Sequence, residues 1–403
     1  MANKKSTRAA QGAGTIRQRP DGRWEARVTV GHDTGTGKQI QKSVYGRTQK
    51  EVREKLTAIT AEIDNGTYIV PSKLTVGQWL DTWIAEYMGD KKYLTVQKYS
   101  SVVRIHLKPA LGAIRLTELS PIHIQKFYNQ LQKTDATGKL GKGKTAKGEN
   151  KPLSVKTVRL IHGVLSKALS VAVLMDLIRS NPAERVTLPK MERKEIHPLT
   201  DEQIRQLMRE ADSDEYGEII KLILFTGLRE AEAVGLTWDC VDFKAGTLKI
   251  NKQLQCRREE DGGYTYAPLK NDRIRVLTVA PYVMDLLQKQ REKQILDRFA
   301  AGELWQGFKD KEEAKTAPVF TRADGQHMVV AVLYRHYKKL AERVGAPESR
   351  VHDLRHTYAV LSLQNEDSIK TVQQNLGHAT AAFTLDVYGH VSEKMKQESA
   401  DRM

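Results

Sequence analysis

The chain has 403 residues, enough for two or three domains with hydrophobic cores of their own. Its formal charge is +16, and the positive excess lies before residue 196, whereas the remainder is close to neutral. No apolar run approaches the ~20 residues of a membrane span, and the basic N-terminus lacks the apolar segment of a signal peptide. Cys240 and Cys256 are too few for a secreted disulfide framework, so a cytoplasmic protein without a membrane partner is expected. The expected partner of this basic half is nucleic acid, whose phosphates attract lysine and arginine. The alternative is that the basic residues form only a solvated surface.

Residues 1–66 are predicted to form a small three-stranded sheet followed by a helix. Alternating polar and apolar residues mark strands at 14–19, 23–31 and 39–46, and a stripe of apolar residues after Thr48 marks the helix. One face of the sheet would pack on that helix. The opposite face would present Arg17, Arg19, Arg23 and Arg27. We expect these arginines to bind a DNA groove. The alternative is that they only keep the hairpin soluble.

Residues 73–190 are predicted to form an all-helical domain with lysine- and arginine-rich polar faces. Helix starts are indicated at Thr75, Thr95, Ser120 and Ser154, and the helix from Thr95 is expected to end before Pro109. The stretch GKLGKGKT at 138–145 matches the P-loop pattern. It follows the end of an amphipathic helix and precedes a polar loop, whereas a P-loop follows a buried strand and opens a helix. An ATP site is therefore not expected there.

Residues 198–403 are predicted to form a third domain, of mixed but mainly helical structure. Strand-like runs occur at 247–251, 264–269 and 273–279, and the last two are expected to form a hairpin with Lys270 at its turn. Near the C-terminus, His352, Arg355, His378 and Tyr388 lie within forty residues of one another. Two imidazoles, a guanidinium and a phenol would suit a phosphodiester.

Five motifs in the C-terminal half occur together in a known order. They are TGLREAEAVGL around Arg229, APLKNDRIRVL around Lys270, HDLRH at 352–356, LGH at 376–378 and LDVYGHV around Tyr388. Over residues 198–391 the sequence thus resembles the tyrosine recombinases, the integrases of phages and conjugative transposons. The preceding helical segment resembles the core-binding domain of this family, and the first 65 residues resemble its arm-site-binding domain. One departure is Ala231, followed by Glu232, where the family often has serine or glycine.

The resemblance implies six catalytic residues: Arg229, Lys270, His352, Arg355, His378 and Tyr388. The two arginines would hold the non-bridging phosphate oxygens, since a guanidinium offers two fixed, charged donors. The lysine would protonate the leaving 5′-oxygen, His352 would assist proton transfer and His378 would bind the phosphate. The tyrosine would form a 3′-phosphotyrosine, with no metal ion or cofactor. Asp353 is expected to be structural, as are His356 and His390 unless they support neighbouring catalytic residues.

The function implied is a site-specific recombinase that integrates and excises a mobile element. Its partners would be double-stranded DNA at core and arm-type sites and three further copies of the chain in a tetramer. The family also makes two accessory proteins plausible, an excisionase and a host DNA-bending protein. The protein would act on the bacterial nucleoid. Two alternatives are a type IB topoisomerase, which shares the phosphotyrosine chemistry, and a non-catalytic DNA-binding regulator on the same scaffold.

Overall fold

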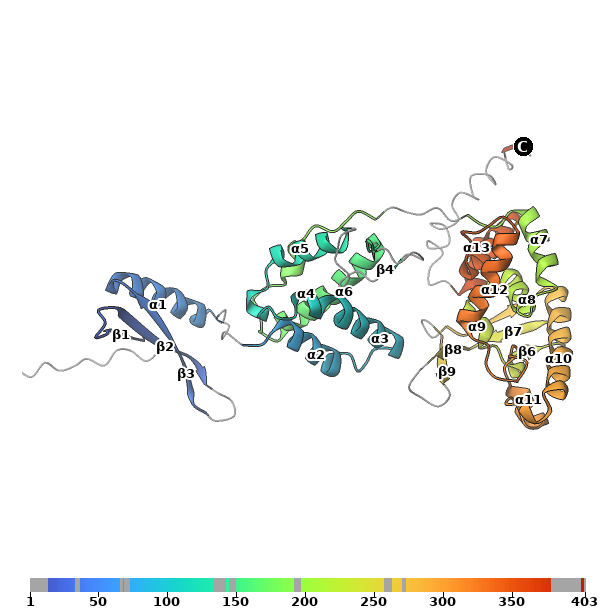
Figure 1. Ribbon diagram of the computed structural model, residues 1–403, viewed down its shortest axis with the longest axis horizontal. Helices are drawn as coiled ribbons and strands as arrows, with labels where there is room; N and C mark the ends of the chain where they lie inside the picture. The colour runs from blue at the N-terminus through green and yellow to red at the C-terminus, as the bar shows by residue number, and fades with distance from the viewer. Residues whose placement is uncertain are drawn as a thin grey trace, which may run out of the picture. The chain divides into compact units, whose positions relative to one another are not determined.

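The computed structural model describes residues 14–32, 37–65, 68, 73–133, 143–144, 150–191, 197–256, 263–269, 273–377 and 400–401. The chain divides into two compact units, Met1–Arg193 and Lys194–Met403. The first unit holds a small sheet with one helix, followed by a helical bundle; the second is mainly helical with small sheets (Figure 1). This multidomain architecture confirms the predicted fold class.

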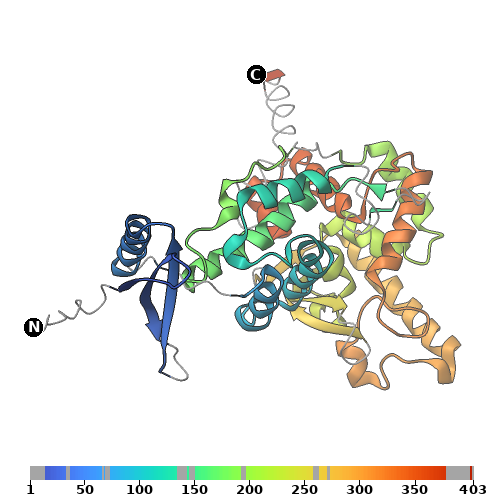
Figure 2. The same cartoon turned by 60° about the vertical axis from the view of Figure 1, so that its left-hand side comes forward.

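The N-terminal sheet is antiparallel with the order β1-β2-β3, and its strands are β1 Thr15–Gln18, β2 Trp24–His32 and β3 Gln39–Gly46. Helix α1, Gln49–Asp64, begins where the Thr48 side chain accepts a hydrogen bond from the backbone N–H of Glu51. It packs against β2 and β3 (Figure 2). The buried core between sheet and helix consists of Ala26, Val28, Val52 and Leu56. Alternation along β2 therefore places its apolar residues on the helix side, as predicted.

The helical bundle consists of α2 Val76–Tyr87, α3 Tyr93–Val102, α4 Lys108–Leu111, α5 Pro121–Leu131 and α6 Val155–Leu174, with 3₁₀ turns at Leu116–Glu118 and Pro182–Arg185. Helix α6 is long and apolar enough to cross a membrane by length and composition alone. In this fold it supplies the centre of the bundle, because Ile161, Leu165 and Leu169 are fully buried. The carbonyl of Ala168 accepts a hydrogen bond of 2.8 Å from the indole of Trp79 on α2.

Two local features of the bundle depart from expectation. The helix expected to end before Pro109 instead continues through it in α4, after a π-helical turn at Val103–Leu107. The backbone stays helical from α3 through the π turn into α4, so Pro109 lies within a continuous helical segment. Between α5 and α6 a pair of two-residue strands forms, β4 Gly143–Lys144 and β5 Asn150–Lys151. The rest of the P-loop-like stretch 138–145 lies outside the described residues.

The helices of the second unit are α7 Asp201–Ala211, α8 Gly217–Thr226, α9 Glu230–Val234, α10 Pro281–Ala301, α11 Lys311–Thr316, α12 Val330–Arg343, α13 Val351–Gln364 and α14 Ile369–Leu376. Helix α8 is buried on nearly every side and packs against α7, α9, α10 and α13. It therefore anchors α9 and α13 (Figure 1). Arg229 is the residue before α9, and His352 lies in the first turn of α13.

The strands of the second unit are β6 Val241–Asp242, β7 Thr247–Ile250, β8 Lys252–Cys256, β9 Tyr264–Pro268 and β10 Arg275–Thr278. The two strands that flank Lys270 have different partners: β9 pairs with β8, and β10 pairs with β7. The prediction that these two strands form one hairpin is therefore wrong. Alternation identified both strands, but the period of two does not determine which strand pairs with which.

Candidate active site

The guanidinium of Arg355 joins three of the predicted motifs. Arg355 lies in the first turns of α13 and is 2% exposed. Its Nη1 donates a hydrogen bond of 2.6 Å to the carbonyl of Gly227, and its Nη2 donates one of 2.5 Å to the carbonyl of Leu376. Gly227 belongs to the TGLR motif and Leu376 to the LGH motif. The fold thus brings together segments separated by more than a hundred residues.

Two glycines end the helices that lead into these motifs. Gly227 caps α8 with a φ of 64°, and Gly377 caps α14 with a φ of 62°. Such left-handed conformations favour glycine, which has no Cβ. A Cβ on Gly227 would lie 2.5 Å from Cδ1 of Tyr358 and 2.7 Å from a methyl of Leu376. The sharp, close-packed turn at Gly227 places Arg229 at the start of α9, beside the other two motifs.

Arg229 is held by a buried carboxylate. It is the N-cap residue of α9, and its Nη1 donates a hydrogen bond of 2.7 Å to Oε1 of Glu232, whose Oε2 accepts one of 3.1 Å from the Arg229 backbone N–H. The Arg229 side chain keeps 25% of its surface exposed, whereas Glu232 keeps 1%. The buried carboxylate fixes one edge of the guanidinium and leaves another part facing solvent.

Glu232 also accepts two hydrogen bonds from Arg275, at 2.6 Å and 3.2 Å. Burial by itself would raise the pKa of Glu232, but hydrogen bonding to Arg275 and the charges of Arg275 and Arg229 lower it to about 2. Glu232 therefore stays ionised at every physiological pH. Two guanidiniums share this one carboxylate, so the cluster retains a positive charge.

The first two turns of α13 carry His352 and His356, whose rings lie 5.1 Å apart, edge to face. Desolvation lowers the pKa of His352, and the charge of Arg355 lowers it further. Burial and the neighbouring His352 lower the pKa of His356 to about 4. At neutral pH both imidazoles are uncharged, which equips His352 to accept a proton.

Asp353, between these histidines, has a structural environment. Its carboxylate accepts hydrogen bonds of 2.9 Å from the backbone N–H of Arg350 and of 2.9 Å from Nη2 of the same residue. One oxygen therefore caps α13, and the other pairs with the Arg350 guanidinium.

Three of the predicted catalytic residues, Lys270, His378 and Tyr388, lie outside the described residues. The structure does describe the chain on both sides of Lys270, which connects β9 to β10. It also describes α14 as far as its cap at Gly377, the residue before His378. The described part of the site therefore comprises Arg229, His352 and Arg355.

Two members of the cluster, Glu232 and Arg275, were missed as site residues by the sequence reasoning. Glu232 had a readable signal, because a carboxylate three residues after an N-cap position is the spacing of a capping box. The sequence also contained a signal for Arg275. In β10 this residue occupies the same face as buried Leu277, while Val276 points to solvent. An arginine on the inner face of a strand requires a buried partner.

The four N-terminal arginines predicted to bind DNA are exposed, but each contacts an acidic residue. Arg17 and Arg27 both contact Glu25, at 2.8 Å and 2.9 Å, and Arg23 contacts Asp21 at 2.9 Å. Arg19 lies 3.8 Å from Asp21, and its guanidinium is 5.5 Å from the centre of the Tyr45 ring. Glu25 is covered, and hydrogen bonding to Arg17 is the main cause that lowers its pKa to about 2. The arginine face is thus an ordered array with a reduced net charge, rather than a row of free cations.

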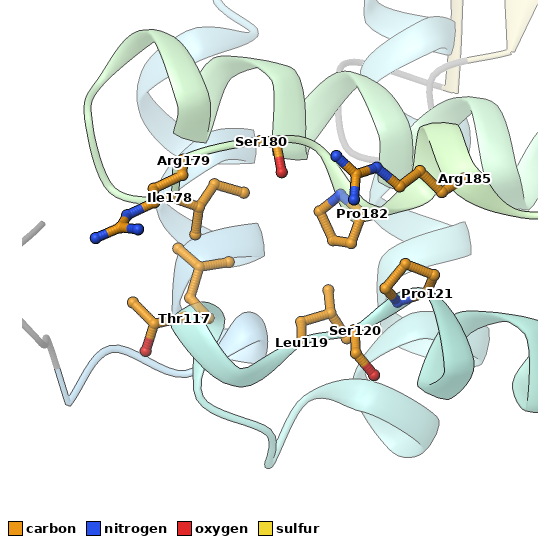
Figure 3. Close-up of a pocket in the computed structure, with 10 residues that line it drawn as sticks. Thr117, Leu119, Ser120, Pro121, Ile178, Arg179, Ser180, Pro182 and Arg185 are labelled. Atoms are coloured by element: carbon orange, nitrogen blue, oxygen red, sulfur yellow. The ribbon is translucent and has the colours of Figure 1, made fainter. Parts of the chain in front are cut away.

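The helical bundle contains a hollow of about 360 Å³ (Figure 3). Its lining consists of Leu116, Thr117, Leu119, Ser120, Pro121, Ile178, Arg179, Ser180, Pro182 and Arg185. Apolar side chains and hydroxyls dominate, with Arg179 and Arg185 toward opposite ends. The lining has no carboxylate or imidazole to act as a general base, and none of the predicted site residues belongs to it.

Comparison with known proteins identifies the family. Residues 197–395 match the model of the phage integrase family, and residues 75–132 match the phage integrase N-terminal SAM-like domain. A XerC-like tyrosine recombinase of Caldanaerobacter subterraneus subsp. tengcongensis is 27% identical, covering 93% of this chain and 94% of the relative. The ICEBs1 integrase of Bacillus subtilis is 22% identical and covers 96% and 99%, respectively.

Solved structures show the same fold. The Tn1549 transposon integrase in complex with a circular intermediate DNA has a TM-score of 0.65 and 20% identity, covering 82% of this chain and all of that one. A lambda integrase tetramer bound to a Holliday junction has a TM-score of 0.54 and 17% identity, covering 91% and 96%. The chain belongs to the phage integrase family of tyrosine recombinases. Its activity is accordingly site-specific DNA recombination of the integrase type.

Proposed function

We propose that this integrase cuts DNA by attack of Tyr388 on the scissile phosphate, forming a 3′-phosphotyrosine, and rejoins it by the reverse step. Arg229 and Arg355 neutralise the charge on the non-bridging oxygens. Lys270 protonates the leaving 5′-oxygen. His352 accepts a proton in the attack, and His378 donates a hydrogen bond to the phosphate. The phosphotyrosine conserves the energy of the broken bond, so rejoining needs no ATP.

The observation that carries this assignment is the pair of hydrogen bonds from Arg355 to the carbonyls of Gly227 and Leu376. They draw the segments that lead to Arg229 and to His378 toward the same guanidinium. In the same cluster, Arg229 and Arg275 carry two positive charges against the one negative charge of Glu232. A site of fixed positive charge beside a neutral His352 supports phosphoryl transfer, because oriented cations stabilise the charge that develops on phosphorus.

We propose three domains with distinct tasks: residues 1–66 bind arm-type DNA, residues 73–190 bind the core site, and residues 198–403 catalyse. The exposed arginines of the N-terminal sheet support the first assignment, and the match to the SAM-like domain supports the second. The Tn1549 and lambda integrases were solved bound to DNA, the latter as a tetramer on a Holliday junction. This chain is proposed to act on double-stranded DNA as a homotetramer, assisted by an excisionase and a host DNA-bending protein, at the bacterial nucleoid in the cytoplasm.

A nicked suicide duplex that carries the core site tests the chemistry. After cleavage, the short fragment 3′ of the cut diffuses away, which traps the protein on the DNA. We expect a covalent adduct with the wild-type chain and none with Tyr388→Phe, which keeps the ring and loses the nucleophile. Adduct formation without strand exchange between two duplexes would favour the type IB topoisomerase. Absence of an adduct on the correct site would favour the non-catalytic regulator.

A further inference from the structure

Arg275 connects several parts of the candidate site through one side chain. Its Nη2 lies 2.6 Å from Oε2 of Glu232 and its Nη1 lies 3.2 Å from Oε1. Its Nε donates a hydrogen bond of 2.8 Å to the carbonyl of Asn375 in the last turn of α14. One planar guanidinium thus contacts both the carboxylate that holds Arg229 and the helix that leads to His378.

The place of Arg275 in the chain adds a third connection. It is the first residue of β10, the strand that follows the Lys270 segment and pairs with β7 through Ile250. A movement of Arg275 would therefore displace the strand that fixes one end of this segment. The Arg275 side chain is 9% exposed, so its guanidinium is committed to protein contacts.

The packing around Arg275 leaves little room for adjustment. An ideal Cβ on Gly377 would lie 3.2 Å from Nη1 of Arg275, so the guanidinium packs directly on the turn that ends α14. Arg355 donates a hydrogen bond to the carbonyl of the next residue, Leu376. Consecutive carbonyls before His378 are thus fixed by two different guanidiniums.

We propose that Arg275 is a positioning residue for strand cleavage: it holds Glu232, and through it Arg229, together with the end of α14 that precedes His378. The inference rests on the proposed catalytic roles of Arg229 and His378. Arg275 itself does not touch the phosphate. Without it, Glu232 keeps a buried charge with one fewer partner, and the last turn of α14 is no longer held at the Asn375 carbonyl.

The test compares Arg275→Met, which keeps length and removes charge, with Arg275→Lys, which keeps charge but cannot bridge two acceptors in one plane. Lys249→Met is the matched control, because Lys249 is an exposed cation on β7 opposite Val276. Full-length proteins are compared for core-site affinity by gel shift and for single-turnover cleavage of the suicide duplex. Circular dichroism and thermal melting record how much of each variant is folded.

We expect Arg275→Met to bind the core site within about threefold of wild type and to cleave at least about 100-fold more slowly, the loss that a misplacement of catalytic groups by about 1 Å can cause. Arg275→Lys should recover part of that rate, and Lys249→Met should cleave like wild type. If Arg275→Met does not fold, Arg275→Lys decides alone. A folded Arg275→Lys that cleaves within twofold of wild type would overturn the proposal.

A pH profile separates positioning from general loss of structure. Burial favours the neutral form of Glu232, so removal of Arg275 should raise its pKa and allow it to protonate in mildly acidic solution. Cleavage by Arg275→Met should then recover as the pH rises, along a limb that the wild-type profile lacks. A rate that merely follows the folded fraction at every pH would contradict positioning. If the wild-type chain forms no adduct, the proposed function fails instead.

Discussion

A buried arginine that donates to backbone carbonyls is the residue around which the candidate site is ordered. The carbonyls of Gly227 and Leu376 both lie within hydrogen-bonding distance of Arg355, and both are drawn toward it from other helices. A lysine ammonium has the same charge but no planar fork, so it would not hold two carbonyls in fixed directions. The geometry explains why arginine rather than lysine occupies this position.

The two histidines of α13 predict an acid-sensitive second unit. The pKa of His356 is about 4 in the folded protein, against an ordinary value of about 6.5 when unfolded. Between these values the unfolded chain binds more protons, so stability should fall as the pH drops from 6.5 toward 4. The loss should be on the order of 2–3 kcal/mol for His356, with a contribution of the same sign from His352.

Urea unfolding of the full-length chain at pH 7, 6 and 5 measures this loss. The variant His356→Gln removes the titrating ring and should flatten the decline between pH 7 and 5 relative to wild type. His197→Gln, which removes an exposed imidazole before α7, provides the control and should decline with pH as the wild type does. An equal decline in His356→Gln would show that the acid sensitivity arises elsewhere.

Among the elements, the end of α8 is the one that most constrains the site. Helix α8 delivers Gly227, whose carbonyl bonds Arg355 and whose left-handed turn starts the path to Arg229. Its apolar residues bury it among α7, α9, α10 and α13, so the turn has little freedom to shift. The element fixes the site through packing and through one backbone conformation.

Gly227→Ala should therefore damage both stability and cleavage. The new methyl would meet Tyr358 at 2.5 Å and Leu376 at 2.7 Å, in addition to the cost of a left-handed alanine. Gly246→Ala is the matched control, since its φ is 66° and nothing lies within 4 Å of the added Cβ. We expect a loss of about 1–2 kcal/mol for the control, measured by thermal unfolding, and a clearly larger one for Gly227→Ala together with loss of the covalent adduct. Equal losses for the two variants would refute a steric role of the turn.

For the molecule as a whole, local patterns predicted the elements better than their partners. Alternation in β2 and the apolar stripe of α1 predicted the N-terminal sheet with its helix, because burial of one face follows directly from the period. The same reasoning identified β9 and β10 but paired them wrongly, because pairing is set by contacts far apart in sequence. The path of the chain through Pro109 was missed for a different reason: a proline is expected to end a helix, but here the helical backbone continues through it after a π turn.

In the candidate site, too, the local motifs could be predicted from the sequence and the contacts between distant residues could not. The motif order predicted that Arg229, His352 and Arg355 belong together, and their segments do converge in the structure. The carboxylate and guanidinium that support Arg229 were not predicted, because the importance of Glu232 and Arg275 arises from their burial against each other. Likewise, the sequence showed four N-terminal arginines but not the pairing of Arg17 and Arg27 with Glu25.

If residues 1–66 bind arm-type DNA as proposed, arm-site binding and cleavage should be separable. Removal of residues 1–66 should leave cleavage of a core-site duplex within a few-fold of wild type and weaken binding to arm-type DNA. Within the full chain, Arg17→Ala combined with Arg27→Ala should reduce the salt dependence of arm-site binding by about one unit of slope for each phosphate that is no longer neutralised. Gel shifts at several salt concentrations measure both effects. Unchanged arm-site binding by the truncated chain would contradict the assignment.

The central claim, that Tyr388 becomes joined to DNA, is tested most directly by mapping the bond itself. The adduct formed on the suicide duplex is digested with trypsin and nuclease, and the nucleotide-bearing peptide is identified by mass spectrometry. The proposed mechanism predicts a 3′-linked nucleotide on Tyr388, with Arg229→Ala and Arg355→Ala greatly reducing its yield. Attachment to a different residue, such as Tyr358, or linkage through a 5′-phosphate would contradict it.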